Sequence, residues 1–200
     1  TVVVSYGLND SALFNAYNDS YVLEKAEKYT QAMALLSPVI NEYPNGYTVN
    51  FRLGWLSYLR GNFSDALRYY RKALSIYPAS VEVLNCVSLV YTKKYLWDKV
   101  EQENKKILKI DYFNHTANYW FIYALKIQKK YDAADKVCRK MLTVFPTSVT
   151  FLYELAEIQY FLEDFDSSLE IFKTVQILDP LNAYVKKYIE DLQKRNKEDE

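Results

Sequence analysis

The feature that most constrains the fold is a recurrence every 34 residues. Four prolines and one tyrosine keep this spacing, at Pro44, Pro78, Tyr112, Pro146 and Pro180. Proline ends a helix because it lacks the backbone N–H and its ring clashes with the preceding turn. Between the first two prolines, residues 47–80 have the pattern of two amphipathic helices on either side of Gly61. A helix-turn-helix unit of this period predicts a stack of helix pairs.

The same frame fits five times without a break, over residues 13–46, 47–80, 81–114, 115–148 and 149–182. Position 17 of each frame is aromatic: Tyr29, Phe63, Trp97, Tyr131 and Phe165. Position 20 is small or compact: Ala32, Ala66, Val100, Ala134 and Ser168. Position 27 is apolar: Val39, Ala73, Ile107, Met141 and Val175. A small residue at position 20 lets the two helices of a pair approach closely, and neighbouring pairs must stack to bury their apolar faces.

Both ends of the chain depart from this frame. Residues 1–12, with the apolar run Val2-Val3-Val4, lie outside it, and we expect an extended arm or a frayed terminus there. In the first frame, Asp19 stands where an apolar core residue is expected, and Pro38 falls inside the second helix, which it should kink or break. Residues 183–200 predict a capping helix with one apolar stripe, followed by a frayed tail.

Residues 47–80 resemble the tetratricopeptide repeat (TPR), whose pattern is W-x2-L-G-x2-Y…A-x3-F…P. The matching residues are Leu53, Gly54, Ala66, Tyr70 and Pro78. Asn50 and Ser57 depart from it, because the family has Trp and Tyr at these two positions. The resemblance implies an all-α fold of the α-solenoid class. It would be a right-handed superhelix of about five TPR-like helix pairs with a C-terminal capping helix.

In TPR-like proteins the first helix of each pair lines a concave groove, at frame positions 2, 5, 6, 9, 12 and 13. These positions share one face of a helix by the 3.6-residue period. The partner-binding residues that the resemblance implies here are mostly aromatic: Tyr17, Tyr21, Phe51, Arg52, Trp55, Tyr58, Leu89, Lys93, Tyr119, Trp120, Tyr123, Lys126, Tyr153, Glu154 and Tyr160. The alternative interpretation of each is packing between neighbouring repeats. The carboxylate clamp of chaperone-binding TPR domains does not match this chain, so we do not expect an acidic chain terminus of that kind as ligand.

Composition argues against several other functions. The 25 Lys and Arg residues balance 25 Asp and Glu residues, so no basic excess indicates a nucleic-acid partner. No apolar run approaches the ~18 residues of a membrane span. The single histidine, His115, and the two cysteines, Cys86 and Cys138, have no metal-ligand spacing, and there is no Gly-rich phosphate loop. We therefore expect no enzyme, no catalytic residue, no metal site and no cofactor.

Tyrosine is unusually frequent, with 20 copies, and its apolar ring and polar tip suit interfaces. Our first hypothesis is a protein-interaction adaptor that holds a partner peptide or helix in an aromatic groove. A self-assembling structural protein, present as a homo-oligomer, is the second, and a scaffold segment of a larger multidomain protein is the third. The compartment stays open between cytoplasmic and exported or periplasmic, because a chain that starts at Thr1 fits both trimming and leader cleavage.

Overall fold

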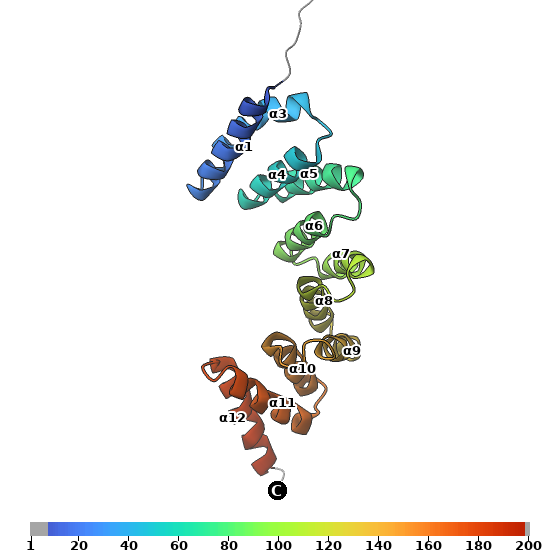
Figure 1. Ribbon diagram of the computed structural model, residues 1–200. Helices are drawn as coiled ribbons and strands as arrows, with labels where there is room; N and C mark the ends of the chain where they lie inside the picture. Colours follow the sequence, from blue (N-terminus) through green and yellow to red (C-terminus); the bar gives the residue numbers. More distant parts are fainter. Residues whose placement is uncertain (1–7, 199–200) are drawn as a thin grey trace, which may run out of the picture. The chain divides into compact units, whose positions relative to one another are not determined.

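The computed structural model describes residues 8–198, which form helices joined by short turns and contain no strand (Figure 1). The helices are α1 (Asp10–Lys25), α2 (Tyr29–Leu35), α3 (Ser37–Glu42), α4 (Tyr47–Leu59), α5 (Phe63–Ile76), α6 (Val81–Lys93), α7 (Trp97–Ile110), α8 (His115–Ile127), α9 (Tyr131–Leu142), α10 (Val149–Phe161), α11 (Phe165–Leu178) and α12 (Ala183–Glu198). The all-α class predicted from the sequence is confirmed. The apolar run Val2–Val4 lies outside the described residues.

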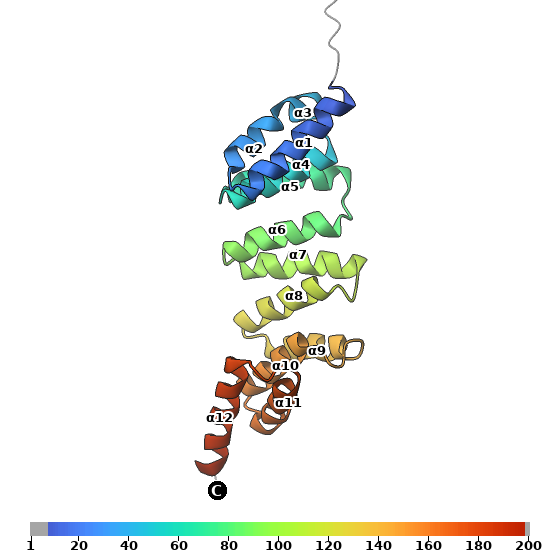
Figure 2. The ribbon, with the colours of Figure 1, turned by 60° about the vertical axis from the view of Figure 1, so that its left-hand side comes forward.

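The chain divides into two compact units at Tyr95. In the first unit, α4 and α5 pack side by side, with α2 and α6 against them (Figure 2). The core here joins residues of α2, α3 and α4, among them Ala32, Val39 and Leu53, all at most 2% exposed. Burial of these apolar side chains is what holds the short helices together.

The second unit runs from Leu96 and contains α7 to α12. Successive helices pack on one another throughout, and α8 also contacts α10. The last helix buries Val185, Ile189 and Leu192 in one cluster with Phe172 and Val175 of α11. Its remaining face is largely exposed, which is how a helix that caps a stack is built.

The turn inside each helix pair also follows the 34-residue period. One residue per pair has a positive φ: Glu27 (57°), Gly61 (76°), Tyr95 (56°), Lys129 (56°) and Glu163 (64°). This left-handed conformation ends the first helix, and it costs side-chain-bearing residues about 1 kcal/mol relative to glycine. Gly61 is the only glycine among these five residues, so only there does the sequence indicate the turn. The other four residues carry side chains and adopt the same conformation, so their identity does not indicate the turn.

The first helix pair differs from the others. Helix α1 begins at Asp10, capped by the Asn9 side chain, which accepts a hydrogen bond from the Ala12 amide at 2.8 Å. The helix therefore includes the last three residues of the predicted 1–12 arm. The predicted break at Pro38 is confirmed, because α2 ends at Leu35 and Pro38 lies in the first turn of α3.

Asp19, the polar residue at an expected core position, is exposed. Its neighbour Ser20 is completely buried, and Ser20 stands one period before Gly54, which is also buried. The first pair therefore keeps the register of the frame although Asp19 is not buried.

Candidate functional site

Arg52 of α4 is the centre of a polar cluster that joins α4 to α1. Its guanidinium forms an ion pair with the Glu24 carboxylate, donates from Nε to the Ser20 hydroxyl at 3.1 Å, and lies 3.7 Å from the centre of the Tyr21 ring. Arg52 is only 5% exposed. Glu24 therefore neutralises the charge of Arg52 inside the protein.

Trp55 shares this cluster, because its indole Nε1 donates to the second oxygen of Glu24 at 2.8 Å. Its ring stacks on Tyr58 with a centroid distance of 5.4 Å. A pocket of about 320 Å³ opens beside it, lined by Tyr21, Glu24, Thr48, Phe51, Arg52, Trp55, Glu82 and Cys86. Four predicted groove residues thus meet in one pocket. Glu24 was not predicted, although it stands at frame position 12, which the family assigns to the groove.

The other predicted groove residues of the first unit do not line this pocket. Tyr17 lines another pocket, of about 570 Å³, with Phe14, Tyr43 and Tyr47. Tyr58 also packs on Phe63, at 5.9 Å between ring centroids. On α6, Leu89 is half-buried and Lys93 is exposed, and neither is among the residues that line these two pockets.

In the second unit, Lys126 of α8 is buried against two carboxylates of α10. Its Nζ lies 2.5 Å from Glu154 Oε2 and is also paired with Glu157. The other oxygen of Glu157 accepts from the Tyr188 hydroxyl of α12 at 2.8 Å. Burial opposes the charge of Lys126, but the two carboxylates outweigh it and raise the pKa of this lysine. Lys126, like Arg52, is therefore a groove residue whose charge is already paired within the protein.

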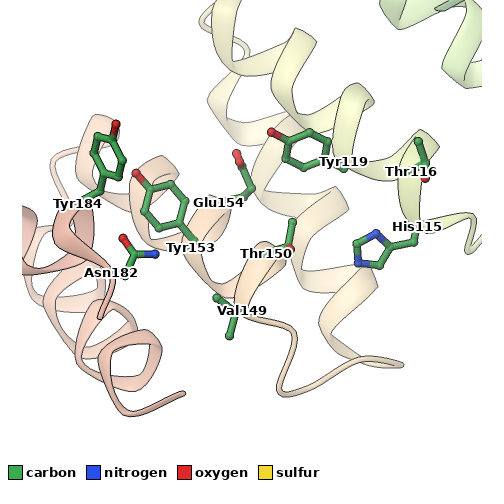
Figure 3. Close-up of a pocket in the computed structure, with 9 residues that line it drawn as sticks. All are labelled: His115, Thr116, Tyr119, Val149, Thr150, Tyr153, Glu154, Asn182 and Tyr184. Carbon is green, nitrogen blue, oxygen red and sulfur yellow. The ribbon is translucent and has the colours of Figure 1, made fainter. Parts of the chain in front are cut away.

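Glu154 lies at the border between this ion cluster and a pocket of about 550 Å³ (Figure 3). The pocket is lined by His115, Thr116, Tyr119, Val149, Thr150, Tyr153, Glu154, Asn182 and Tyr184. Burial raises the pKa of Glu154, and Lys126 only partly compensates. Burial likewise raises the pKa of Tyr153 to about 12 and raises that of Tyr119, so both phenols keep their protons at neutral pH.

Three of the predicted groove residues, Tyr119, Tyr153 and Glu154, therefore converge on this pocket. Tyr184 was not predicted, because it belongs to α12, outside the repeat frame. His115, the single histidine, lines the opposite end of the pocket, with its ring 4.7 Å from that of Phe151. Neither residue carried a sequence signal for a site.

Trp120, Tyr123 and Tyr160 are the other predicted aromatic residues of this unit. Trp120 and Tyr123 lie edge to face at 5.7 Å, and Tyr123 also contacts Trp97 at 5.3 Å. Tyr160 donates to Asp191 of α12 at 2.8 Å and lines a further pocket of about 350 Å³. For Tyr123 and Tyr160 the packing interpretation therefore applies at least in part.

Neither cysteine has the environment of a nucleophile. Burial raises the pKa of Cys86 to about 11, and burial likewise raises the pKa of Cys138. Within residues 8–198, no three His, Cys, Asp or Glu side chains are grouped so that they could hold a metal ion. None of the described helices combines the length and apolarity that a membrane span requires.

Residues 47–80 match the family model for the tetratricopeptide repeat. Among solved structures, a tetratricopeptide repeat protein from Parabacteroides merdae ATCC 43184 is similar with a TM-score of 0.82 and 20% identity, over 91% of this chain and 72% of that one. The fold is that of a TPR protein. MamA from Desulfovibrio magneticus RS-1 (TM-score 0.75, 15% identity, 88% and 98% coverage) and YrrB (TM-score 0.70, 14% identity, 86% and 89% coverage) are also similar. No curated protein sequence gives a significant match.

The TPR frame accounts for the buried positions of this chain. Position 24, where the family has an aromatic residue, is completely buried in all five frames: Leu36, Tyr70, Asn104, Cys138 and Phe172. Asn50, which stands in place of the family's Trp, is buried and donates to the carbonyl oxygens of Pro44 (3.1 Å) and Gly46 (2.8 Å). Asn118, which stands two frames later, makes the equivalent two bonds to the carbonyl oxygens of Tyr112 (3.1 Å) and Asn114 (2.8 Å). The asparagine that replaces the family's Trp thus stabilises the turn before α4 and the turn before α8.

Proposed function

We propose that this chain is a protein-interaction module that binds a partner peptide or helix on the aromatic face of its first helices. The observation that carries the proposal is the convergence of half-buried aromatic side chains on open pockets in each unit. Phe51 and Trp55 line one of them, and Tyr119 and Tyr153 line the other. Aromatic anchors in desolvated pockets supply much of the binding energy of interfaces.

The fold supports the same proposal. YrrB, which has this fold, is described as a TPR protein with an unusual peptide-binding site. At 14% identity that description does not transfer residue by residue. It supports a peptide as the class of ligand, while the contacts proposed here come from the pockets of this chain.

The test is the double variant Trp55→Ala with Tyr119→Ala, because each of these residues lines one of the two pockets. Partners are captured from an extract of the native source, identified by mass spectrometry, and titrated against the wild-type and variant chains. We expect the double variant to weaken partner binding by at least about 30-fold, since truncating an anchor costs ~2 kcal/mol or more. Circular dichroism should show an intact helical fold.

Tyr112→Ala is the matched control, because Tyr112 is 58% exposed in the turn before α8 and lines none of these pockets. It should bind the partner as the wild type does. Unchanged affinity in the folded double variant would contradict the proposal.

A second candidate function is self-assembly, favoured by an exposed apolar corner between α11 and α12. Ile177 is 81% exposed, Leu181 86% and Tyr184 74%. Exposed apolar groups close together mark surfaces that associate. Light scattering over a concentration series tests this idea, with Ile177→Asp and Leu181→Asp expected to prevent association. A strict monomer at high concentration would rule it out.

A further inference from the structure

We infer that the pocket lined by Tyr119, Tyr153, Glu154 and Tyr184 binds a basic side chain, an ammonium or guanidinium group of a partner peptide. The inference specifies the ligand chemistry of the proposed function and rests on it for the source of the cation. The pocket's own preference for a cation follows from its charges and rings, and it can be measured without any partner.

The charges around Lys126 do not balance. This ammonium is paired with two carboxylates, Glu154 and Glu157. The Tyr188 hydroxyl that also reaches Glu157 adds a hydrogen bond but no charge. The neighbouring ions form pairs of their own, Arg139 with Asp135 and Arg195 with Asp191. With both carboxylates ionised, the cluster therefore carries one negative charge in excess.

The excess negative charge is poorly solvated. Glu154 and Lys126 are only 5% and 9% exposed. Buried charges are stable when each is paired, and an unpaired one costs several kcal/mol. A second cation placed beside Glu154 would balance the cluster, whereas a carboxylate or phosphate ligand would add to the repulsion.

Aromatic rings surround Glu154 in the pocket. In Figure 3, Tyr119 and Tyr153 lie on either side of Glu154, and the Tyr119 hydroxyl is turned toward it. Tyr184 stands next to Tyr153 at the outer end, where it is 74% exposed and accessible to a ligand. The faces of aromatic rings attract cations through their quadrupole. Rings that flank a carboxylate therefore favour a basic side chain over an apolar one.

The lining of the pocket leaves room for a cation. Glu154 is its only acidic residue, and no lysine or arginine of the described chain lines it. Lys126 pairs with Glu154 but is not among the lining residues, so no lysine or arginine of the described chain fills the pocket itself. The volume of about 550 Å³ lies in the range of ligand sites, so a long side chain can enter.

The test uses two small probes, Nα-acetyl-lysine amide, whose side-chain ammonium is free, and its uncharged counterpart Nα-acetyl-norleucine amide. Each is titrated into the isotope-labelled chain and followed by NMR. We expect saturable amide shifts at residues 115–119, 149–154 and 182–184 with the lysine probe, and none with the norleucine probe. Glu154→Gln should abolish the lysine response. This change preserves side-chain volume and leaves Lys126 paired with Glu157.

Two further variants examine the contribution of the Tyr184 ring and the effect of net charge. Tyr184→Leu changes an exposed residue, so it should fold normally, and we expect about threefold weaker binding of the lysine probe from loss of the ring. Glu170→Gln removes one exposed carboxylate from α11 and should leave binding unchanged, which separates the pocket from the effect of net charge. Equal responses to both probes, or a wild-type response in Glu154→Gln and Tyr184→Leu, would overturn the inference.

Selection from a random displayed-peptide library separates this inference from the proposed function. If selected peptides bind the aromatic face but show no enrichment of Lys or Arg, the cation pocket is refuted and the interaction module stands. If the lysine probe binds as expected but no peptide or partner is captured, the proposed function fails and the cation pocket stands.

Discussion

Gly54 shows how one residue of the repeat pattern is constrained by packing. A Cβ atom at this position would lie 2.5 Å from Cε1 and 2.6 Å from Cδ1 of Tyr70. Tyr70 is completely buried, so its ring has little room to move away. The glycine is therefore needed for the close approach of α4 and α5, and not for any backbone conformation that only glycine adopts.

We predict that Gly54→Ala destabilises the chain by about 1–3 kcal/mol, the usual cost of overpacking. The prediction opposes the intrinsic preference of helices, which favours Ala over Gly by about 1 kcal/mol. Urea unfolding followed by circular dichroism measures the change.

The matched control is Ala156→Gly, at the same frame position in α10, where a methyl group already fits in the buried core. That variant should lose about 1 kcal/mol or more of stability. If Gly54→Ala were more stable than the wild type, the proposed packing constraint would be wrong.

At the scale of elements, Glu101 connects α7 to the turn between α8 and α9. It accepts hydrogen bonds from Lys105 (2.5 Å), Lys130 (2.9 Å) and Gln128 (3.1 Å). Burial alone would raise the pKa of Glu101, but these three donors outweigh it and lower the pKa from 4.5 to about 2. The ionised form is therefore favoured in the folded chain.

A carboxyl group whose pKa is lower in the folded state contributes stability above its unfolded pKa and loses it as pH falls through the folded value. We predict that Glu101→Gln lowers the free energy of unfolding by about 1–2 kcal/mol at pH 7, a figure reduced for the partial exposure of both lysines. The difference between variant and wild type should shrink from about pH 4.5 downward and vanish near pH 2.

Urea unfolding of both chains at several pH values provides the measurement. Lys130→Gln should reproduce part of the loss, because it removes one of the three donors. A difference between Glu101→Gln and wild type that stays constant from pH 7 to pH 2 would contradict the assignment.

At the scale of the whole molecule, stability in a stack of repeats is close to a sum of contributions from each pair and its neighbours. We expect the first pair to contribute least to the stability of its unit. Its second helix is broken into α2 and α3, of 7 and 6 residues, and Ser20 is the buried residue of α1. The α4–α5 pair has unbroken helices of 13 and 14 residues.

We predict that native-state hydrogen exchange is faster in α1 to α3 than in α4 and α5, because local opening of the first pair breaks fewer buried contacts. Exchange measured by NMR or mass spectrometry, under conditions where the chain is folded, tests this order. Equal protection across α1 to α5 would contradict the prediction and mean that these helices open only together.

The sequence by itself determined the helix-pair register and the fold class. Position 20, for example, is small or compact in every frame, and Ala32, Ala66 and Ala134 are completely buried as the pattern predicts. Pro38 likewise predicts the break between α2 and α3. Such features follow from local helix chemistry and packing between adjacent helices, both of which repeat with the chain.

Only the tertiary structure decided which charged residues of the predicted groove are already paired within the protein. Arg52 is neutralised by Glu24, 28 residues away, and Lys126 by Glu157, 31 residues away. It also brought Tyr184 of α12 to the pocket of Tyr153 and Glu154. Ion pairing depends on side-chain distances and burial between helices that no periodic pattern encodes. The repeat therefore specifies the scaffold, while the charge and shape of the pockets depend on how its helices meet.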